Sequence, residues 1–105
     1  REFLYVDDLA DACVHLMASD YAGDLVNIGT GEDVTIGELA HTIMDVVGYR
    51  GEVVFDTSKP DGTPRKVLDT SRLTATGWTP RYDLDTGLAS TYQWFLDHQD
   101  DLVTR

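Results

Sequence analysis

The spacing of hydrophobic and polar residues predicts four helices joined by short extended segments. Apolar side chains recur three and four residues apart in four stretches, residues 7–19, 35–47, 70–77 and 86–99. Runs of β-branched and aromatic residues predict short strands at 3–6, 25–28 and 53–55, with 66–69 briefly extended. Helices alternating with strands indicate an α/β fold, but three short strands cannot form a complete doubly wound sheet.

Residue types at the helix ends predict where several helices begin and stop. Thr35 and Glu38 have the spacing of a capping box, and Gly48 is placed to end that helix. Asp7 or Asp8 is expected to cap the first helix. The faces expected to be buried are Leu9, Cys13, Leu16 and Met17 on the first helix and Leu88, Tyr92, Phe95 and Leu96 on the last.

Composition narrows the possible partners. The chain has 105 residues, enough for one small domain, and its net charge of −11 argues against nucleic acid and anionic membranes as partners. No apolar run approaches the roughly 20 residues of a membrane span. The single Cys13 excludes an internal disulfide and fits a reducing, cytoplasmic compartment. Because no initiator Met opens the sequence, we expect a segment of a longer protein.

Several motifs that suggest catalysis or cofactor binding are incomplete. The turn at residues 29–33 follows an extended segment as a dinucleotide-binding turn does, but Val34 stands where that fingerprint needs a third glycine, so a tight turn is the better interpretation. No tyrosine has a lysine four residues later, the pair that reductases of the short-chain type require. The three histidines lie on different predicted helices, so no metal site is expected.

One loop carries a functional signal. Half of the eight basic residues lie within residues 50–66, and the loop at 59–66 places Asp61 and a glycine beside Arg65 and Lys66. Arginine binds phosphate oxygens through a two-pronged fork, and lysine acts as a point charge. From spacing alone, a diphosphate clamp and a solvated surface loop are both open interpretations.

The motifs taken in order resemble those of a known family. Residues 1–10, 27–31 and 77–80 resemble segments shared by extended short-chain dehydrogenases that act on nucleotide sugars. Residues 55–66, with their proline-rich loop, are more selective and resemble the GDP-L-fucose synthases. Those enzymes make GDP-L-fucose from GDP-4-keto-6-deoxy-D-mannose by epimerisation and NADPH reduction. The resemblance implies that residues 1–105 form a single C-terminal substrate-binding fragment, with no complete Rossmann sheet and with the NADP-binding domain outside it.

The resemblance also implies roles for particular residues. Arg1 and Lys66 are expected against the nucleotide diphosphate of a GDP-sugar, with Asp61 and Arg65 as further substrate-binding candidates. The family's catalytic residues and its NADPH turn match no position here, and Cys13 does not match the catalytic cysteine. We therefore expect the chain alone to be inactive, to need no metal and to self-associate. The alternatives are a part of a related nucleotide-sugar epimerase or dehydratase, and a detached module that only folds and oligomerises.

Overall fold

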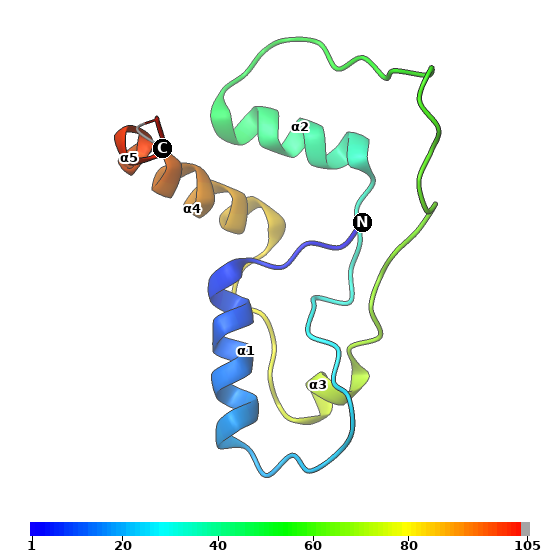
Figure 1. Cartoon of the computed structure of the whole chain (residues 1–105), viewed down its shortest axis with the longest axis vertical. Helices are drawn as coiled ribbons and strands as arrows, with labels where there is room; N and C mark the ends of the chain where they lie inside the picture. Colours follow the sequence, from blue (N-terminus) through cyan, green and yellow to red (C-terminus); the bar gives the residue numbers. More distant parts are fainter. Residues whose placement is uncertain (104–105) are drawn as a thin grey trace.

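The computed structural model describes residues 1–103 and forms five helices within that range (Figure 1). In chain order they are α1 (Val6–Ala18), α2 (Ile36–Val47), α3 (Ser71–Ala75), α4 (Leu84–Asp97) and α5 (Gln99–Val103). The four predicted helices are confirmed with small shifts of their ends, and the short α5 is additional. None of the helices in the described range is long and apolar enough to cross a bilayer.

The predicted short strands are wrong. Residues 3–6, 25–28 and 53–55 contain no regular strand within the described chain. The one antiparallel backbone pair there joins Arg1 and Val34, with N–O distances of 2.7 and 2.9 Å. A strand persists only when its backbone groups bond to a neighbour, and a local preference for extended structure cannot show that this neighbour exists. The α/β prediction is corrected to a helical, partial domain.

The ends of α2 follow the prediction. The side chain of Thr35 accepts from the backbone N–H of Glu38, and the Glu38 carboxylate accepts from the backbone N–H of Thr35, both at 3.0 Å. Gly48 ends the helix at φ +76°, a conformation that glycine adopts without strain. The start and the end of α2 are therefore determined by local sequence.

The expectation that Asp7 or Asp8 caps α1 is wrong. Tyr5 occupies the N-cap position, and no side chain caps the helix. Asp8 is 1% exposed, and its two carboxylate oxygens accept hydrogen bonds from the backbone nitrogens of Arg81 and Tyr82, each at 3.0 Å. Hydrogen bonds to an ionised acceptor stabilise a fold by roughly 1.5–3 kcal/mol each. Asp8 therefore fastens α1 to the segment that leads into α4.

The buried core is small and lies between α1, α3 and the turn after α3. Its buried apolar residues are Ala12, Leu73 and Trp78, with Leu4, Leu16, Val26 and Ile28 packed around them. The indole nitrogen of Trp78 donates to the carboxylate of Asp11 at 2.9 Å, so the polar edge of the buried ring has a partner.

The predicted inner faces of the long helices are only partly confirmed. Leu16 packs against the core, and Leu88 and Tyr92 are partly buried. The other residues predicted on the buried faces are exposed, namely Leu9, Cys13, Met17, Phe95 and Leu96. The inner face of α1 is formed by Asp8 and Ala12. The hydrophobic pattern therefore predicted the wrong rotation of α1, because the acidic side chain of Asp8 points inward.

The molecule is open rather than compact. Its radius of gyration is 16.8 Å, against about 13 Å for a compact domain of this length. Its accessible surface is 8211 Å², against about 5,900 Å² for a folded monomer of this mass. The excess is larger than the roughly 800 Å² that each partner loses in a standard interface. The surface includes large apolar side chains of three helices, among them Val14, Met17, Ile36, Ile43, Trp94 and Phe95.

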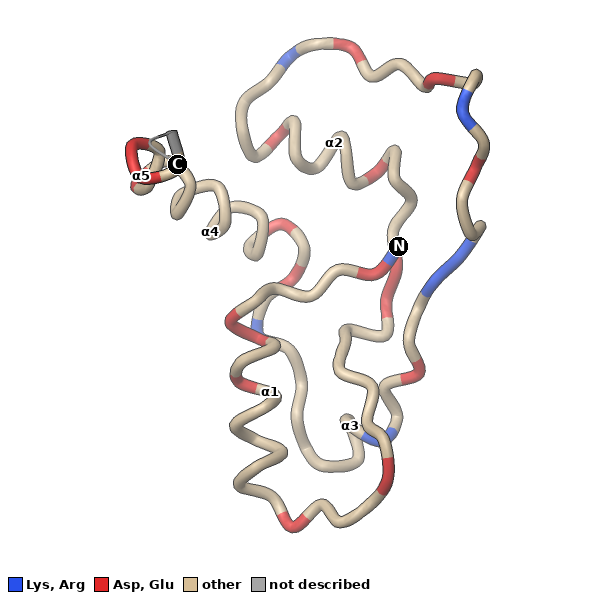
Figure 2. Tube along the Cα trace, in the orientation of Figure 1, with Lys and Arg blue, Asp and Glu red and all other residues tan. Residues whose placement is uncertain are grey.

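Residues 49–69, here called the arc, form a long helix-free connection from α2 to α3 (Figure 1). In Figure 1 the arc passes over α2 and then runs down the right side of the molecule to α3. It carries four of the eight basic residues of the chain, Arg50, Lys59, Arg65 and Lys66, as the blue segments in Figure 2 show. The cationic loop predicted from sequence is thus a part of this arc.

Replacing Asp8 by alanine is expected to lower the free energy of unfolding by about 3 kcal/mol, because two backbone N–H groups lose the carboxylate oxygens that accept from them. Asp8→Asn keeps one acceptor oxygen and is expected to lose less. Urea denaturation followed by circular dichroism measures both variants.

Asp45→Ala is the matched control, since it removes the same charge from an exposed position on α2. Equal denaturation midpoints for Asp8→Ala and Asp45→Ala would contradict the fastening role of Asp8.

Candidate functional site

An open groove of about 720 Å³ lies where the start of the chain, the turn before α2 and the arc meet. Its walls bring together residues that are more than 60 positions apart in sequence. The residues that line it are Arg1, Asp33, Val34, Thr35, Ile36, Glu38, Asp61, Gly62, Thr63, Pro64 and Arg65. Three of the four predicted substrate-binding residues, Arg1, Asp61 and Arg65, therefore share one surface.

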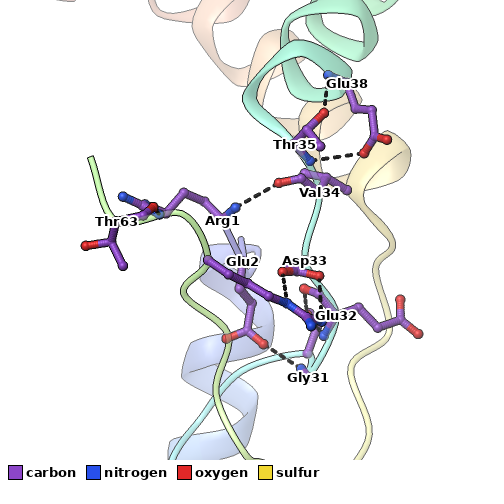
Figure 3. A network of polar contacts seen from close by, with 11 residues as sticks. Arg1, Glu2, Gly31, Glu32, Asp33, Val34, Thr35, Glu38 and Thr63 are labelled. Atoms are coloured by element: carbon purple, nitrogen blue, oxygen red, sulfur yellow. Dashed lines mark hydrogen bonds and ion pairs between the residues drawn. The ribbon is translucent and has the colours of Figure 1, made fainter. Parts of the chain in front are cut away.

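Arg1 connects the three segments that build the groove (Figure 3). Its backbone pairs with Val34, at the end of the turn before α2. Its guanidinium reaches the arc, where Nη1 donates to the carbonyl oxygen of Thr63 at 2.6 Å. One bond leaves most of the five guanidinium donors unused, so Arg1 retains the capacity to bind an anion.

Arg65 reaches across the groove in the opposite direction, from the arc to the turn. Its Nε lies 2.6 Å from one oxygen of Asp33 and its Nη2 lies 3.2 Å from the other, a two-pronged ion pair. This hydrogen bond with Arg65 holds the pKa of the Asp33 carboxyl below its usual value, and the same contact raises the pKa of Arg65. The side chain of Arg65 is 71% exposed, so the guanidinium N–H groups that Asp33 does not take are open to solvent.

Asp61 and Lys66 complete the predicted set but lie differently. Asp61 is exposed and lines the groove. Lys66 is exposed and follows Arg65 in sequence, but it is not among the described residues that line the groove. The structure therefore brings Arg1, Asp61 and Arg65 together in one groove, whereas Lys66 lies outside the groove lining. Their roles as ligands of a diphosphate stay predictions.

The charges in the groove do not simply favour an anion. Two arginines face three carboxylates, those of Asp33, Glu38 and Asp61. Asp33 is compensated by its pair with Arg65, and Glu38 is engaged in the capping box of α2. The positive end of the α2 dipole, at Thr35 and Ile36, also opens on this groove. The unused guanidinium donors and this helix end are the groups that favour a phosphate here.

The turn at 29–33 is built by its glycines and by Glu2. Gly31 has φ +76°, and its backbone nitrogen donates to Glu2 at 2.6 Å (Figure 3). A side chain at Gly29 would begin 2.6 Å from the other oxygen of Glu2 and 3.1 Å from Leu68. The sequence indicated a tight turn here but not the roles of Glu2 and Asp33. Both residues lie in segments that the sequence singled out, but each finds its partner about 30 residues away, which no local pattern shows.

The histidines and the cysteine lie apart from the groove. His15 contacts Thr76 at 3.1 Å through its Nε2, and His98 stacks on Trp94 at the end of α4. Cys13 is exposed on α1. Within residues 1–103, no three His, Cys, Asp or Glu side chains are grouped so that they could hold a metal ion.

No protein-family model matches the chain, but individual proteins do. The chain is 57% identical over 99 residues to a putative GDP-L-fucose synthase 2 of Arabidopsis thaliana. It is 56% identical over 109 residues to the GDP-L-fucose synthase of Escherichia coli (strain K12). The alignments cover 93% and 95% of this chain but only 30% and 34% of those proteins, so the chain spans about a third of their length.

Solved structures give the same relationship. A GDP-6-OMe-4-keto-L-xylo-heptose reductase of Campylobacter jejuni superposes with a TM-score of 0.83 at 35% identity, over 93% of this chain and 31% of that one. A GDP-mannoheptose C4 reductase of the same organism, solved with NADP bound, gives 0.78 at 37% identity, over 90% and 31%. The chain thus has the fold of one part of these reductases, and along nearly its whole length it is similar to the C-terminal portion of the GDP-L-fucose synthases.

Proposed function

We propose that this chain is the nucleotide-sugar-binding portion of a GDP-L-fucose synthase and that its groove holds the diphosphate of a GDP-sugar. The observation that carries the proposal is the convergence of Arg1 and Arg65 on one groove, in a chain 57% identical to such a protein. The unused donors of both guanidinium groups offer charge-assisted hydrogen bonds to phosphate oxygens. Lys66, one residue further along the arc, adds a third cation, and Asp61 offers an acceptor to the donors of a nucleoside.

In the whole enzyme this grip would position a sugar that reacts elsewhere. GDP-4-keto-6-deoxy-D-mannose would be epimerised and then reduced, with NADPH as the source of hydride. Contacts with the distant diphosphate place the sugar correctly and so contribute to the rate of the reaction. The residues of this chain bind and orient the substrate, and we expect no turnover from the 105 residues alone.

The turn at 29–33 does not suit the pyrophosphate of NADPH. The carboxylate of Glu2 already accepts from the backbone N–H of Gly31, and its negative charge would repel a phosphate. Helix α2 begins only at Ile36, several residues after the glycines. These contacts support a cofactor site in another part of the enzyme.

Two alternatives remain distinguishable by experiment. A related nucleotide-sugar epimerase or dehydratase would use the same cationic arc for a different base. A detached, non-catalytic module would have the fold without ligand binding. The loop at residues 55–66 favours the GDP-L-fucose synthases, because the other motifs are shared more widely.

Calorimetric titration of the chain with GDP and GDP-mannose is expected to give binding heat. Lys66→Ala is expected to weaken binding about tenfold, because it removes one cation beside the diphosphate. Lys59→Ala is the matched control, since Lys59 is also an exposed lysine of the arc but, unlike Lys66, is not next in sequence to a residue that lines the groove. It is expected to change affinity less than twofold.

No heat with either nucleotide would favour the inert module. Equal binding of UDP-sugars would instead support a related epimerase or dehydratase.

We also propose that the chain self-associates, because its total accessible surface exceeds that of a folded monomer of this mass and includes many large apolar side chains. Sedimentation velocity at several protein concentrations is expected to show species larger than a monomer. Met17→Glu and Trp94→Glu place charges on two of the exposed apolar faces and are expected to shift the distribution toward monomer. A single, concentration-independent monomer would contradict the proposal.

A further inference from the structure

The arc is held to the rest of the molecule by few contacts in its cationic portion. Within residues 1–103, the hydrogen bonds that leave residues 56–66 are those of Thr63 with Arg1 and of Arg65 with Asp33. The other hydrogen bonds of this stretch are local, between Asp56 and the two or three residues that follow it. The position of the cationic loop over the groove therefore depends on two arginines, one at each side.

Asp33 is the better fixed partner in the second of these contacts. Its side chain is 22% exposed, compared with 71% for Arg65. The turn that carries it is anchored on both sides, by the bond from Gly31 to Glu2 and by the backbone pair of Val34 with Arg1. Asp33 thus belongs to a fixed support, whereas Arg65 lies on the tethered arc.

Two effects of Asp33 on a bound diphosphate have opposite signs. As a negative charge in the groove it repels phosphate, so its removal would tighten binding. As the partner of Arg65 it holds a long and flexible side chain, together with its loop, in the position from which the other N–H groups reach an anion. The charge of Asp33 is already compensated by Arg65 at 2.6 Å, which weakens the repulsion. Preorganising a rotamer-rich side chain and a loop lowers the entropic cost of binding, so the second effect dominates.

We infer that Asp33 is a positioning residue for the nucleotide site, which holds Arg65 and the arc beside Arg1 in readiness for a diphosphate. The inference rests on the proposed function. Asp33 acts through Arg65 rather than by touching the ligand. Because the carboxylate takes two of the guanidinium donors, it also sets the direction in which the remaining donors face.

The test combines GDP titration with a double-mutant cycle. Asp33→Asn is expected to weaken GDP binding about tenfold, although it removes a negative charge from the groove. Asp33→Glu retains a carboxylate and is expected to restore affinity to within about threefold. In an Arg65→Ala background, Asp33→Asn is expected to have no further effect, because the residue through which it acts is absent. Glu32→Gln, one residue earlier in the same turn and exposed, is the control for charge removal and is expected to bind as the unsubstituted chain does.

A second measurement does not depend on the nucleotide. Amide hydrogen exchange of residues 56–66 in the free chain is expected to accelerate in Asp33→Asn and not in Glu32→Gln, while exchange in α1 stays unchanged.

Unchanged or tighter GDP binding by Asp33→Asn would overturn the inference. The inference would also fall if Asp33→Asn weakened GDP binding as much in the Arg65→Ala background as it does in the unsubstituted chain. If the unsubstituted chain binds no GDP, the proposed function falls, and the role of Asp33 toward a nucleotide falls with it. The exchange measurement would then still decide whether Asp33 tethers the arc.

Discussion

The fold depends on the buried carboxylate of Asp8. Within residues 1–103, three buried apolar side chains are too few to position five helices, so a polar contact helps to join the two halves of the structure. One half is α1 with the small core around Trp78, and the other is α4 packed against α2. Asp8 fixes the segment between them through the backbone nitrogens of Arg81 and Tyr82, and the ring of Tyr82 adds a contact with Tyr5 at a centroid distance of 4.4 Å.

The groove is assembled on the same principle. Its three walls come from distant parts of the chain and meet through hydrogen bonds and one ion pair rather than through apolar packing. Such contacts are directional and weak in water, so they define a geometry that ligand binding can reinforce. An anion between Arg1 and Arg65 would join the arc to the start of the chain more firmly than Thr63 and Asp33 do alone.

Local signals in the sequence predicted local structure well. The capping box at Thr35 and the glycine at 48 identified α2 because each acts within a single helical turn. The strands were predicted wrongly because they need a partner that no local pattern reveals. The rotation of α1 was missed because Asp8, an acidic residue, points inward. The cationic loop could be recognised from composition, whereas the pair of Arg65 with Asp33 spans 32 positions and became visible only in three dimensions.

The small core also determines how the isolated chain responds to heat. The heat-capacity change of unfolding arises mainly from apolar surface that becomes hydrated, and a compact domain of this length gives about 1.4 kcal/mol/K. Here much of the apolar surface is hydrated already, as the exposure of Met17 and Trp94 illustrates. The isolated chain should therefore have a stability curve with little curvature and a broad calorimetric transition. A partner that covers this surface would increase the curvature and narrow the transition.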